Sequence, residues 1–366
     1  MKKNHNILVC PLDWGIGHAT RCVPIIDELL KQGANVILGA DKRPLAFLKT
    51  EYPQLKTIVF PGYKFSYPKN GDMVVKMGLQ VPKIMAGIRK EHKLLDKIIT
   101  DHKIDAVISD NRFGLWSKKV PSVFMTHQLK VKMPSENRFG ENMLFKLNKW
   151  FIQKYDECWV PDFEEGDNLS GDLSHFENEI GSLFFIGPLS RFSKLKNENI
   201  AKDFQNDILV VLSGPEPQRT ILENKLLEEL PKLHLKCVVV GGKTELLEQK
   251  QISKNIKFYS HLNSKDLFQL FNNSEYIISR PGYSSIMDLT ALGKKAIFIP
   301  TPGQTEQEYL AHKFHNMKVH YGMGQVKIDL ALAIKEINGF KAVEHKVEPL
   351  LLGKRIQSLI DLLKPE

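Results

Sequence analysis

A glycine-containing turn near the N-terminus carries residues that could bind an anion and move a proton. It reads GIGH and places Gly15, Gly17 and His18 between a short apolar run and a helical pattern, with Arg21 one turn further on. Glycine lets the backbone approach a ligand, free N–H groups at a helix start favour an anion, and histidine titrates near neutral pH. The turn therefore predicts a loop that contacts ligand. The structural alternative is a tight turn whose histidine only caps the helix.

A second turn of this kind lies in the stretch 276–310, which reads as strand, turn, helix and strand. Arg280 and Gly282 occupy the turn, and Ser284 and Ser285 begin a helical pattern. Serine hydroxyls at a helix start can cap the helix or donate to a phosphate. Asp288, one turn into the helix, could accept hydrogen bonds from ribose hydroxyls. The pattern predicts a phosphate site, and an ordinary βαβ unit with a capped helix is the alternative.

Polar residues also follow two predicted strands of the N-terminal half. Asp110, Asn111 and Arg112 follow one strand, and His127 follows the next. Ligands bind at the carboxyl ends of strands in open α/β sheets, so these side chains are candidates for a site. His127 could act in acid–base chemistry, and Asp110 could be a base or could orient His127.

Strand and helix patterns that alternate along both halves are typical of parallel, doubly wound sheets. The 366 residues exceed the size of a single core, so we expect two domains, 1–190 and 191–366, joined by a polar linker near 188–204. The last helix, 351–364, is amphipathic and able to pack back on the first domain. We predict an α/β fold of two Rossmann-like domains, each with a doubly wound parallel sheet, that face each other across a cleft.

Composition limits the class of protein. Hydrophobic residues make up 42% and charged residues 25%, as in soluble globular proteins, and no apolar run is long enough for a membrane span or a signal peptide. Four cysteines without CxxC spacing predict buried thiols in a reducing, cytoplasmic compartment, with no zinc or other metal site.

The net charge of +9 predicts an acidic partner, such as a nucleotide diphosphate or an anionic membrane surface. Nucleic acid is not expected, because zinc-finger, ribonucleoprotein and helix-turn-helix signatures are absent. A basic helical stretch at 74–102 predicts a solvated face or, alternatively, a surface near lipid. Walker A, HExxH and GxSxG arrangements are also absent, which disfavours P-loop enzymes, zincins and serine hydrolases.

Taken together, the motifs resemble the GT-B glycosyltransferases, nearest the MurG branch, and the C-terminal half is most similar to the glycosyltransferase family 28 C-terminal domain. The GIGH loop resembles the glycine-rich loop of this family. The remaining matching residues are Thr126-His127-Gln128, Ser279-Arg280-Pro281-Gly282, Ser284-Ser285, Asp288, Leu292-Gly293-Lys294, Pro300 and Gln307-Glu308.

The resemblance implies that the C-terminal domain binds a nucleotide sugar, most often a UDP-sugar that carries a hexose or N-acetylhexosamine. The N-terminal domain would hold a carbohydrate or a lipid-linked acceptor of the cell envelope, which makes peripheral contact with the inner face of the cytoplasmic membrane plausible. The implied reaction is a single inverting displacement that needs no metal or other cofactor. His18 is the first candidate for the base, and Asp110 and His127 are the alternatives.

The resemblance also implies a set of binding residues. Those on the donor side would contact the diphosphate, the ribose, the base and the sugar: Ser213, Gly214, His261, Leu262, Arg280, Gly282, Ser284, Ser285, Asp288, Gln307 and Glu308. Those of the loops on the acceptor side are Gly15, Gly17, Arg21, Asn111 and Arg112.

The chain departs from the family pattern at three places. Asp288 stands where the family usually has Glu, which shortens the reach to a ribose by one methylene. Pro215 and Pro217 remove two N–H donors from a loop that the family can use around phosphate. The first loop, DWGIGH, is poorer in glycine than the family form.

Two other functions remain open. The run GIGHATRC also resembles the loop of the UDP-sugar hydrolase of pseudaminic acid synthesis, so a nucleotide-sugar hydrolase or epimerase is one alternative. A non-catalytic subunit that binds nucleotide sugar is the other.

Overall fold

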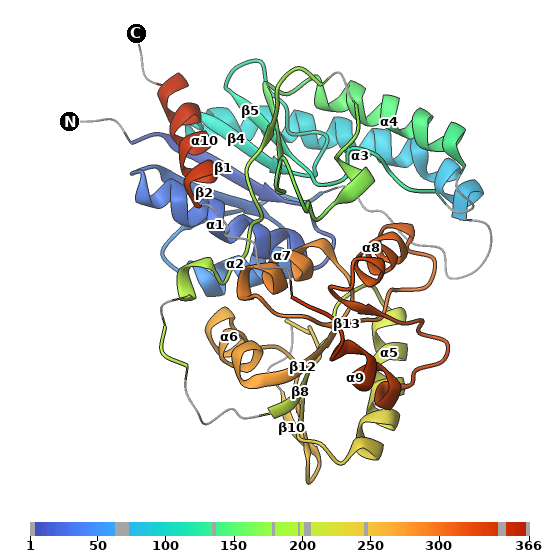
Figure 1. The fold of residues 1–366 in the computed structure, drawn as a ribbon. Helices are drawn as coiled ribbons and strands as arrows, with labels where there is room; N and C mark the ends of the chain where they lie inside the picture. Colours follow the sequence, from blue (N-terminus) through green and yellow to red (C-terminus); the bar gives the residue numbers. More distant parts are fainter. Residues whose placement is uncertain are drawn as a thin grey trace.

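The computed structural model describes residues 4–62, 73–133, 137–177, 180–196, 198–200, 206–244, 248–342 and 349–363. These residues form two α/β domains, each built on a seven-stranded sheet with helices packed on it (Figure 1). The predicted fold class is thereby confirmed. Within the predicted linker 188–204, residues 197 and 201–204 lie outside the described residues, as does residue 364 of the predicted last helix.

Every neighbouring pair of strands in the first sheet is parallel. The sheet has the order β3-β2-β1-β4-β5-β6-β7. Its strands are β1 (Asn6–Pro11), β2 (Asn35–Ala40), β3 (Lys56–Val59), β4 (Ala106–Asp110), β5 (Ser122–Met125), β6 (Glu157–Val160) and β7 (Leu183–Phe185). The order reverses between β1 and β4, and Pro11 at the end of β1 pairs with Asp110 at the end of β4. Ligands bind outside the carboxyl ends of strands at such a reversal.

The second sheet has the order β10-β11-β9-β8-β12-β13-β14, and its order reverses between β8 and β12. Its strands are β8 (Asn206–Val211), β9 (Cys237–Val240), β10 (Gln249–Ser253), β11 (Ile256–Tyr259), β12 (Ser274–Ser279), β13 (Ile297–Phe298) and β14 (Tyr321–Gly322). Among the described strands of this sheet, β10 alone is antiparallel to its neighbour. The sequence did not predict β10, because its five residues are polar or exposed and show no apolar alternation.

Helices cover both sheets and connect the parallel strands. In the first domain they are α1 (Gly17–Lys31), α2 (Lys42–Glu51), α3 (Met73–His102) and α4 (Arg138–Ile152). In the second they are α5 (Gln218–Glu229), α6 (Ser264–Asn273), α7 (Tyr283–Leu292), α8 (Thr305–Asn316) and α9 (Leu330–Ile337), followed by α10 (Pro349–Leu362). Among the described helices, none is long and apolar enough to cross a membrane.

The last helix, α10, lies beside α1 of the first domain (Figure 1). Its apolar residues Leu352, Ile356 and Leu359 join the same buried cluster as α1. The side chain of Gln32 donates to the carbonyl of Gly353 at 2.9 Å. The chain therefore returns to its first domain after completing the second.

A continuous apolar cluster connects the two domains. It contains strand residues of the first sheet together with Tyr283, Ile286 and Met287 of α7. Phe192, in the linker, packs on Phe268 of α6 with ring centroids 5.9 Å apart. Because interiors pack as densely as organic crystals, this cluster holds α1 and α7 in a defined relation.

Candidate active site

The amino ends of α1 and α7 meet between the domains. Ser284, at the start of α7, donates its hydroxyl to the carbonyl of Gly17, at the start of α1, at 2.7 Å. A Cβ atom on Gly17 would lie 3.2 Å from the Ser284 Oγ, which is tighter than an ordinary contact. Glycine at position 17 therefore permits the approach, and the two turns identified in the sequence lie side by side.

The amino end of α7 has backbone donors to offer. Gly282 is the N-cap and supplies no side-chain cap, and the first helical bond runs from Ile286 N–H to the Gly282 carbonyl. The N–H groups of Tyr283, Ser284 and Ser285 precede that bond and have no acceptor within the helix. The Ser285 hydroxyl makes no hydrogen bond within the described part of the chain, whereas that of Ser284 is engaged by Gly17. Such a helix start favours a bound anion.

Arg280, two residues before the N-cap Gly282, is a fully buried cation. It donates to the carbonyls of Ile299 at 2.9 Å and Gln218 at 3.0 Å, and its Nε has no partner among the described residues. Burial lowers its pKa to about 10. An isolated charge is costly to bury, so this guanidinium would be stabilised by an anion.

The other buried arginines differ from Arg280 in this respect, since each forms an ion pair with a carboxylate. The pairs are Arg21 with Asp110, Arg112 with Glu91, Arg191 with Asp288, and Arg219 with Glu216 and Glu223.

Further polar groups lie near the ends of β12 and β13. The hydroxyls of Ser279 and Thr301 are buried and have no hydrogen-bond partner among the described residues. Gly214, after Ser213 in the loop that follows β8, has φ +104°, and a Cβ there would lie 3.6 Å from the Thr301 Oγ1. The loop at Ser213 and Gly214 therefore approaches the same edge of the sheet as Arg280.

On the first domain, His18 and Asp110 form a hydrogen-bonded pair. His18 Nδ1 lies 3.0 Å from Asp110 Oδ2, and Asp110 is completely buried. Burial would raise the pKa of Asp110, but Arg21 and then His18 outweigh that effect and lower it. The lowered pKa favours the ionised carboxylate, which can only accept hydrogen bonds.

The imidazole of His18 is neutral at physiological pH. Burial lowers its pKa most, and Arg21 and His127 lower it further, while Asp110 opposes them. Nδ1 lies 3.0 Å from Asp110 Oδ2 and 2.9 Å from Arg21 NH2, and in the tautomer that donates Nδ1–H to Asp110 the Nε2 lone pair is left to accept a proton. This is the arrangement of a general base with an orienting carboxylate.

His127 lies at the same edge, but both of its ring nitrogens have partners. Nδ1 lies 2.9 Å from Arg21 NH1, and Nε2 lies 2.8 Å from Glu306 Oε1 on α8 of the second domain. Its ring stacks on Tyr283, with centroids 4.0 Å apart. Of the three candidate bases, His18 is therefore the one with a ring nitrogen, Nε2, that has no hydrogen-bond partner among the described residues.

Asp288 is placed differently from its expected position. Its buried carboxylate accepts from Ser190 Oγ at 2.7 Å and lies 3.4 Å from Arg191 Nε, so it binds the segment between the domains. Burial raises its pKa, and Arg191 offsets part of the rise. These contacts give Asp288 a role in fixing the interdomain segment, and a ribose contact stays a prediction.

Two arginines expected beside the acceptor are also engaged within the protein. Arg21 is bound to Asp110. Arg112 pairs with Glu91 and donates to the carbonyls of Phe60 and Pro61, which ties the end of β3 to α3. The sequence could not show this, because the acidic partners lie on separate elements.

The remaining predicted residues lie in loops and helix starts on the interdomain side of their sheets. Asn111 has φ +58° directly after β4, and Gly15 has φ +78° in the first loop. Gln307 accepts from Thr301 N–H and Glu308 accepts from Gly303 N–H, both at 2.9 Å, so the two side chains hold the loop before α8. His261 and Leu262 follow β11, as predicted.

Two residues of the second domain that contact His127, Glu306 and Tyr283, are not among the site residues predicted from the sequence. Burial would raise the pKa of Glu306, but His127 and Arg21 outweigh it and lower that pKa. Glu306 directly precedes the predicted pair Gln307-Glu308, so its place at the start of α8 was the available signal.

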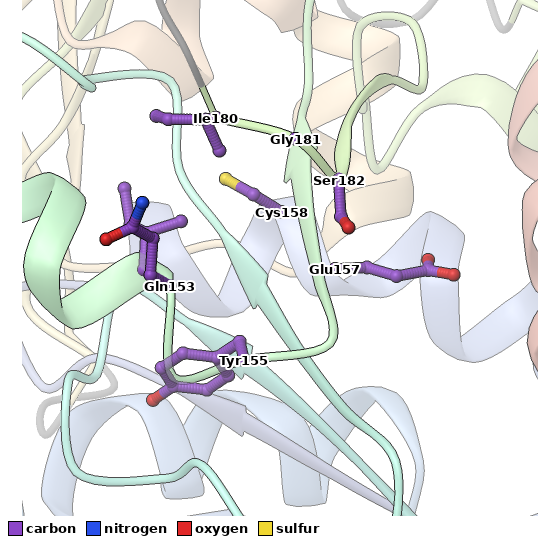
Figure 2. A pocket seen from close by; sticks show the side chains of 8 residues that line it. Gln153, Tyr155, Glu157, Cys158, Ile180, Gly181 and Ser182 are labelled. Carbon is purple, nitrogen blue, oxygen red and sulfur yellow. The ribbon is translucent and has the colours of Figure 1, made fainter.

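A small hollow of about 140 Å³ lies elsewhere on the first domain (Figure 2). Its lining includes Gln153 and Tyr155 before β6, Cys158 on β6, and Ile180 and Ser182 before β7. These residues lie toward the amino ends of the strands. The hollow is therefore at the edge opposite Asp110 and His127, and it is not part of the candidate site.

The chain is similar in sequence to known glycosyltransferases. Residues 208–347 match the Glycosyltransferase family 28 C-terminal domain. A glycosyltransferase of Methanosarcina acetivorans is 23% identical over 308 residues, covering 80% of this chain and 79% of the relative. The UDP-N-acetylglucosamine–N-acetylmuramyl-(pentapeptide) pyrophosphoryl-undecaprenol N-acetylglucosamine transferase of Rickettsia akari is 23% identical over 335 residues, covering 83% and 80%.

Solved structures show the same fold. The glycotransferase of kitacinnamycin aligns with a TM-score of 0.63 at 13% identity and covers 99% of this chain and 95% of its own. UGT89C1 of Arabidopsis thaliana aligns with a TM-score of 0.59 at 12% identity and covers 99% and 96%.

Proposed function

We propose that this chain, a MurG-like glycosyltransferase of the GT-B fold, transfers a hexose or N-acetylhexosamine from a UDP-sugar to an acceptor hydroxyl with inversion. The Rickettsia akari relative carries UDP-N-acetylglucosamine in its name, which favours this donor class. We further propose that the reaction needs no metal.

The observation that carries the proposal is the contact between Ser284 and Gly17. It places the amino end of α7, an anion-favouring helix start, next to His18, the residue that follows Gly17. A donor whose diphosphate lies at α7 would therefore present its sugar close to a neutral imidazole. Positioning of this kind can supply much of the rate enhancement in a displacement reaction.

The donor's diphosphate would receive hydrogen bonds from the first N–H groups of α7 and from the Ser285 hydroxyl. Arg280 would supply the positive charge that the second domain leaves unpaired at this edge. Negative charge grows on the diphosphate as it leaves, so these donors stabilise the transition state more than the ground state. Loss of one such donor typically costs about 2.7–4 kcal/mol in the barrier.

His18 would accept the proton of the acceptor hydroxyl on Nε2. The oxygen then attacks the anomeric carbon from the face opposite the diphosphate, and the bond between that carbon and the phosphate oxygen breaks. A single displacement inverts the configuration at that carbon. Asp110 would stabilise the imidazolium that forms, because its carboxylate lies 3.0 Å from Nδ1, which carries a proton in that form.

A thermal-shift screen with UDP, GDP, dTDP and their sugars tests the donor class. A ligand that binds only the folded state raises the melting temperature, so UDP and UDP-sugars should stabilise selectively. Stabilisation by GDP or dTDP but not by UDP would overturn the UDP assignment.

Hydrolysis of the nucleotide sugar is the second candidate function, because the run GIGHATRC resembles the loop of a UDP-sugar hydrolase. Purified protein incubated with UDP-sugar alone would release UDP and free sugar if water were the acceptor. A transferase should release little UDP until an acceptor is added. Donor binding without turnover under both conditions would indicate a subunit that only binds nucleotide sugar.

The exposed face of α4 supports the proposed membrane contact of a cytoplasmic enzyme. Phe139, Met143, Leu147 and Trp150 recur every three or four residues, and their side chains are 82%, 61%, 41% and 50% exposed. Lys154 lies over the Trp150 ring at 3.6 Å. An apolar stripe with cations beside it suits the surface of an anionic bilayer.

Flotation with anionic liposomes at low and high salt tests this contact. Phe139→Ser with Trp150→Ser should abolish flotation, whereas Val326→Ser, at an 86% exposed site on the second domain, should not. Equal flotation of both variants and the wild-type protein would contradict the assignment to α4.

A further inference from the structure

One buried guanidinium connects all the titratable groups at the centre of the candidate site. Arg21 is 2% exposed. Its Nε lies 3.0 and 2.9 Å from the two carboxylate oxygens of Asp110, and its NH2 also donates to that carboxylate. Its NH1 lies 2.9 Å from Nδ1 of His127, and its NH2 lies 2.9 Å from Nδ1 of His18.

These contacts fix the tautomer of His127. A guanidinium can only donate hydrogen bonds, so Nδ1 of His127 must accept from Arg21. In the neutral ring the proton is then on Nε2, which donates to Glu306 Oε1 at 2.8 Å. Tyr283 of the second domain stacks on the ring with an interplanar angle of 10°, which also restricts its orientation.

The opposite side of Arg21 acts on His18. Arg21 aligns the carboxylate of Asp110, whose Oδ2 lies 3.0 Å from Nδ1 of His18, and its own NH2 lies 2.9 Å from the same nitrogen. The carboxylate accepts and so favours a proton on Nδ1, whereas the guanidinium donates and so opposes one. In the Nδ1–H form, Nε2 is the nitrogen left for an acceptor hydroxyl.

We propose that Arg21 is a positioning residue that, together with Asp110, sets the balance between the tautomers of His18 and links His18, through His127, to the docking of α8 from the second domain. This inference rests on the proposed function in one respect, namely that His18 is the base. It adds that Glu306, at the start of α8, is connected to His18 through His127 and Arg21. A movement of α8 relative to the first domain would therefore change the hydrogen bonds around His18.

The charges around His18 predict the effect of removing Arg21. The groups that face it are Arg21 on α1, Asp110 at the end of β4, His127 after β5, and Glu306 on α8. Arg21 opposes protonation of His18, whereas Asp110 favours it. Without the guanidinium the attraction of Asp110 is less opposed, so the pKa of His18 should rise.

Ring ¹⁵N NMR of histidine-labelled full-length protein tests the proposal without donor or acceptor. The resonance lost in His18→Ala identifies His18. In Arg21→Gln its pKa should rise by about one unit or more, the size expected of a neighbouring charge, and the neutral ring should shift toward the Nδ1–H form, because the guanidinium no longer donates to Nδ1. An unchanged pKa and tautomer in a folded Arg21→Gln protein would overturn the proposal.

Arg21→Lys is a second test of the proposal, for use if Arg21→Gln does not fold. Lysine keeps a charge opposite Asp110 but lacks the planar fork that reaches Asp110 and His127 together. The His127 tautomer should therefore become mixed in this variant. If both histidines kept their wild-type tautomers in Arg21→Lys, the fork would not be positioning them and the proposal would be wrong.

Glu306→Gln tests the link to the second domain. It should shift the ring resonances of both His127 and His18, whereas Glu336→Gln, on the exposed face of α9, should shift neither. A shift confined to His127 would overturn the link to α8. Because these readouts need no turnover, their failure is distinct from a failure to find transferase activity.

Discussion

Two buried arginines, one in each domain, face the same interface with opposite electrostatic arrangements. Arg21 in the first domain is neutralised by Asp110 and hydrogen-bonded on every side. Arg280 in the second domain donates only to carbonyls, and no carboxylate pairs with it among the described residues. The first arrangement is complete without a ligand, whereas the second would gain from an added anion.

The difference indicates a division of labour between the domains. Around Arg21, fixed charges hold one imidazole neutral and oriented, which is what acid–base chemistry needs. Around Arg280, a cation without a carboxylate partner among the described residues lies two residues before Gly282, the N-cap of α7, which is what recognition of a diphosphate needs. The predictions below alter one side at a time, from the largest expected effect to the smallest.

The largest effect should follow from His18→Ala, which removes the nitrogen that the first domain keeps available. Loss of a general base typically costs about 10²–10⁴ in rate, and binding of UDP should be unchanged. Since the pKa of His18 is lowered from its usual 6.5, the wild-type rate should stay high above that value and fall only at more acidic pH. Initial rates of UDP release across pH, with the thermal shift by UDP, measure both quantities.

His312→Ala, at an exposed position on α8, is the matched control for that experiment. It should leave the rate and its pH dependence unaltered. A His18→Ala enzyme with full activity would contradict the assignment of the base.

The next largest effect should be on the unfolding free energy, which should fall by different amounts in Arg21→Gln and Arg280→Gln. Arg21→Gln leaves a buried carboxylate without its partner, which costs about 3–5 kcal/mol of unfolding free energy. Arg280→Gln loses hydrogen bonds to two carbonyls but also relieves an unpaired buried charge, so its loss should be smaller, about 1–2 kcal/mol. Urea unfolding followed by circular dichroism gives both values, and equal losses would remove the contrast between the two domains.

The affinity for UDP should fall more in Arg280→Gln than in Arg21→Gln. Removing a charged donor to the diphosphate should weaken UDP binding by about 1.5–3 kcal/mol, roughly 10- to 150-fold. Calorimetry measures the affinity. Arg89→Gln, on the exposed surface of α3, makes the same change in net charge and should leave UDP binding intact at physiological salt. Equal weakening in both variants would mean that Arg280 acts only through the overall charge.

Features that depend on local sequence could be predicted. Both turns follow from glycine and serine placed between a strand run and a helix run, and the alternation of these runs predicts two parallel sheets. The stretch 276–310 contains the predicted strand, turn, helix and strand, which are the end of β12, the turn at residues 280–282, α7 and β13. By contrast, the five polar residues of β10 become a strand only because β11 offers an edge to pair with.

The partner of each charged residue could not be predicted, because partners come from distant parts of the chain. Asp288 has the spacing of a ribose ligand, yet its carboxylate binds Ser190 and Arg191. Nothing in the neighbourhood of Glu306 distinguishes it from Gln307, although only Glu306 reaches across to His127. Such pairings depend on how the two domains pack together.

The smallest effect is also the most discriminating, because it compares two adjacent residues of identical chemistry. Ser284 donates to Gly17 across the interface, and Ser285 has no partner among the described residues. Ser284→Ala should therefore lower the unfolding free energy by about 0.5–1.5 kcal/mol, while Ser285→Ala should leave it unchanged. In calorimetry with UDP the order should reverse, because only Ser285 has a hydroxyl free to donate to the phosphate. If Ser284→Ala weakened UDP binding as much as Ser285→Ala without loss of stability, the Ser284 hydroxyl would turn from Gly17 to the nucleotide, and the contact between the domains would yield when donor binds.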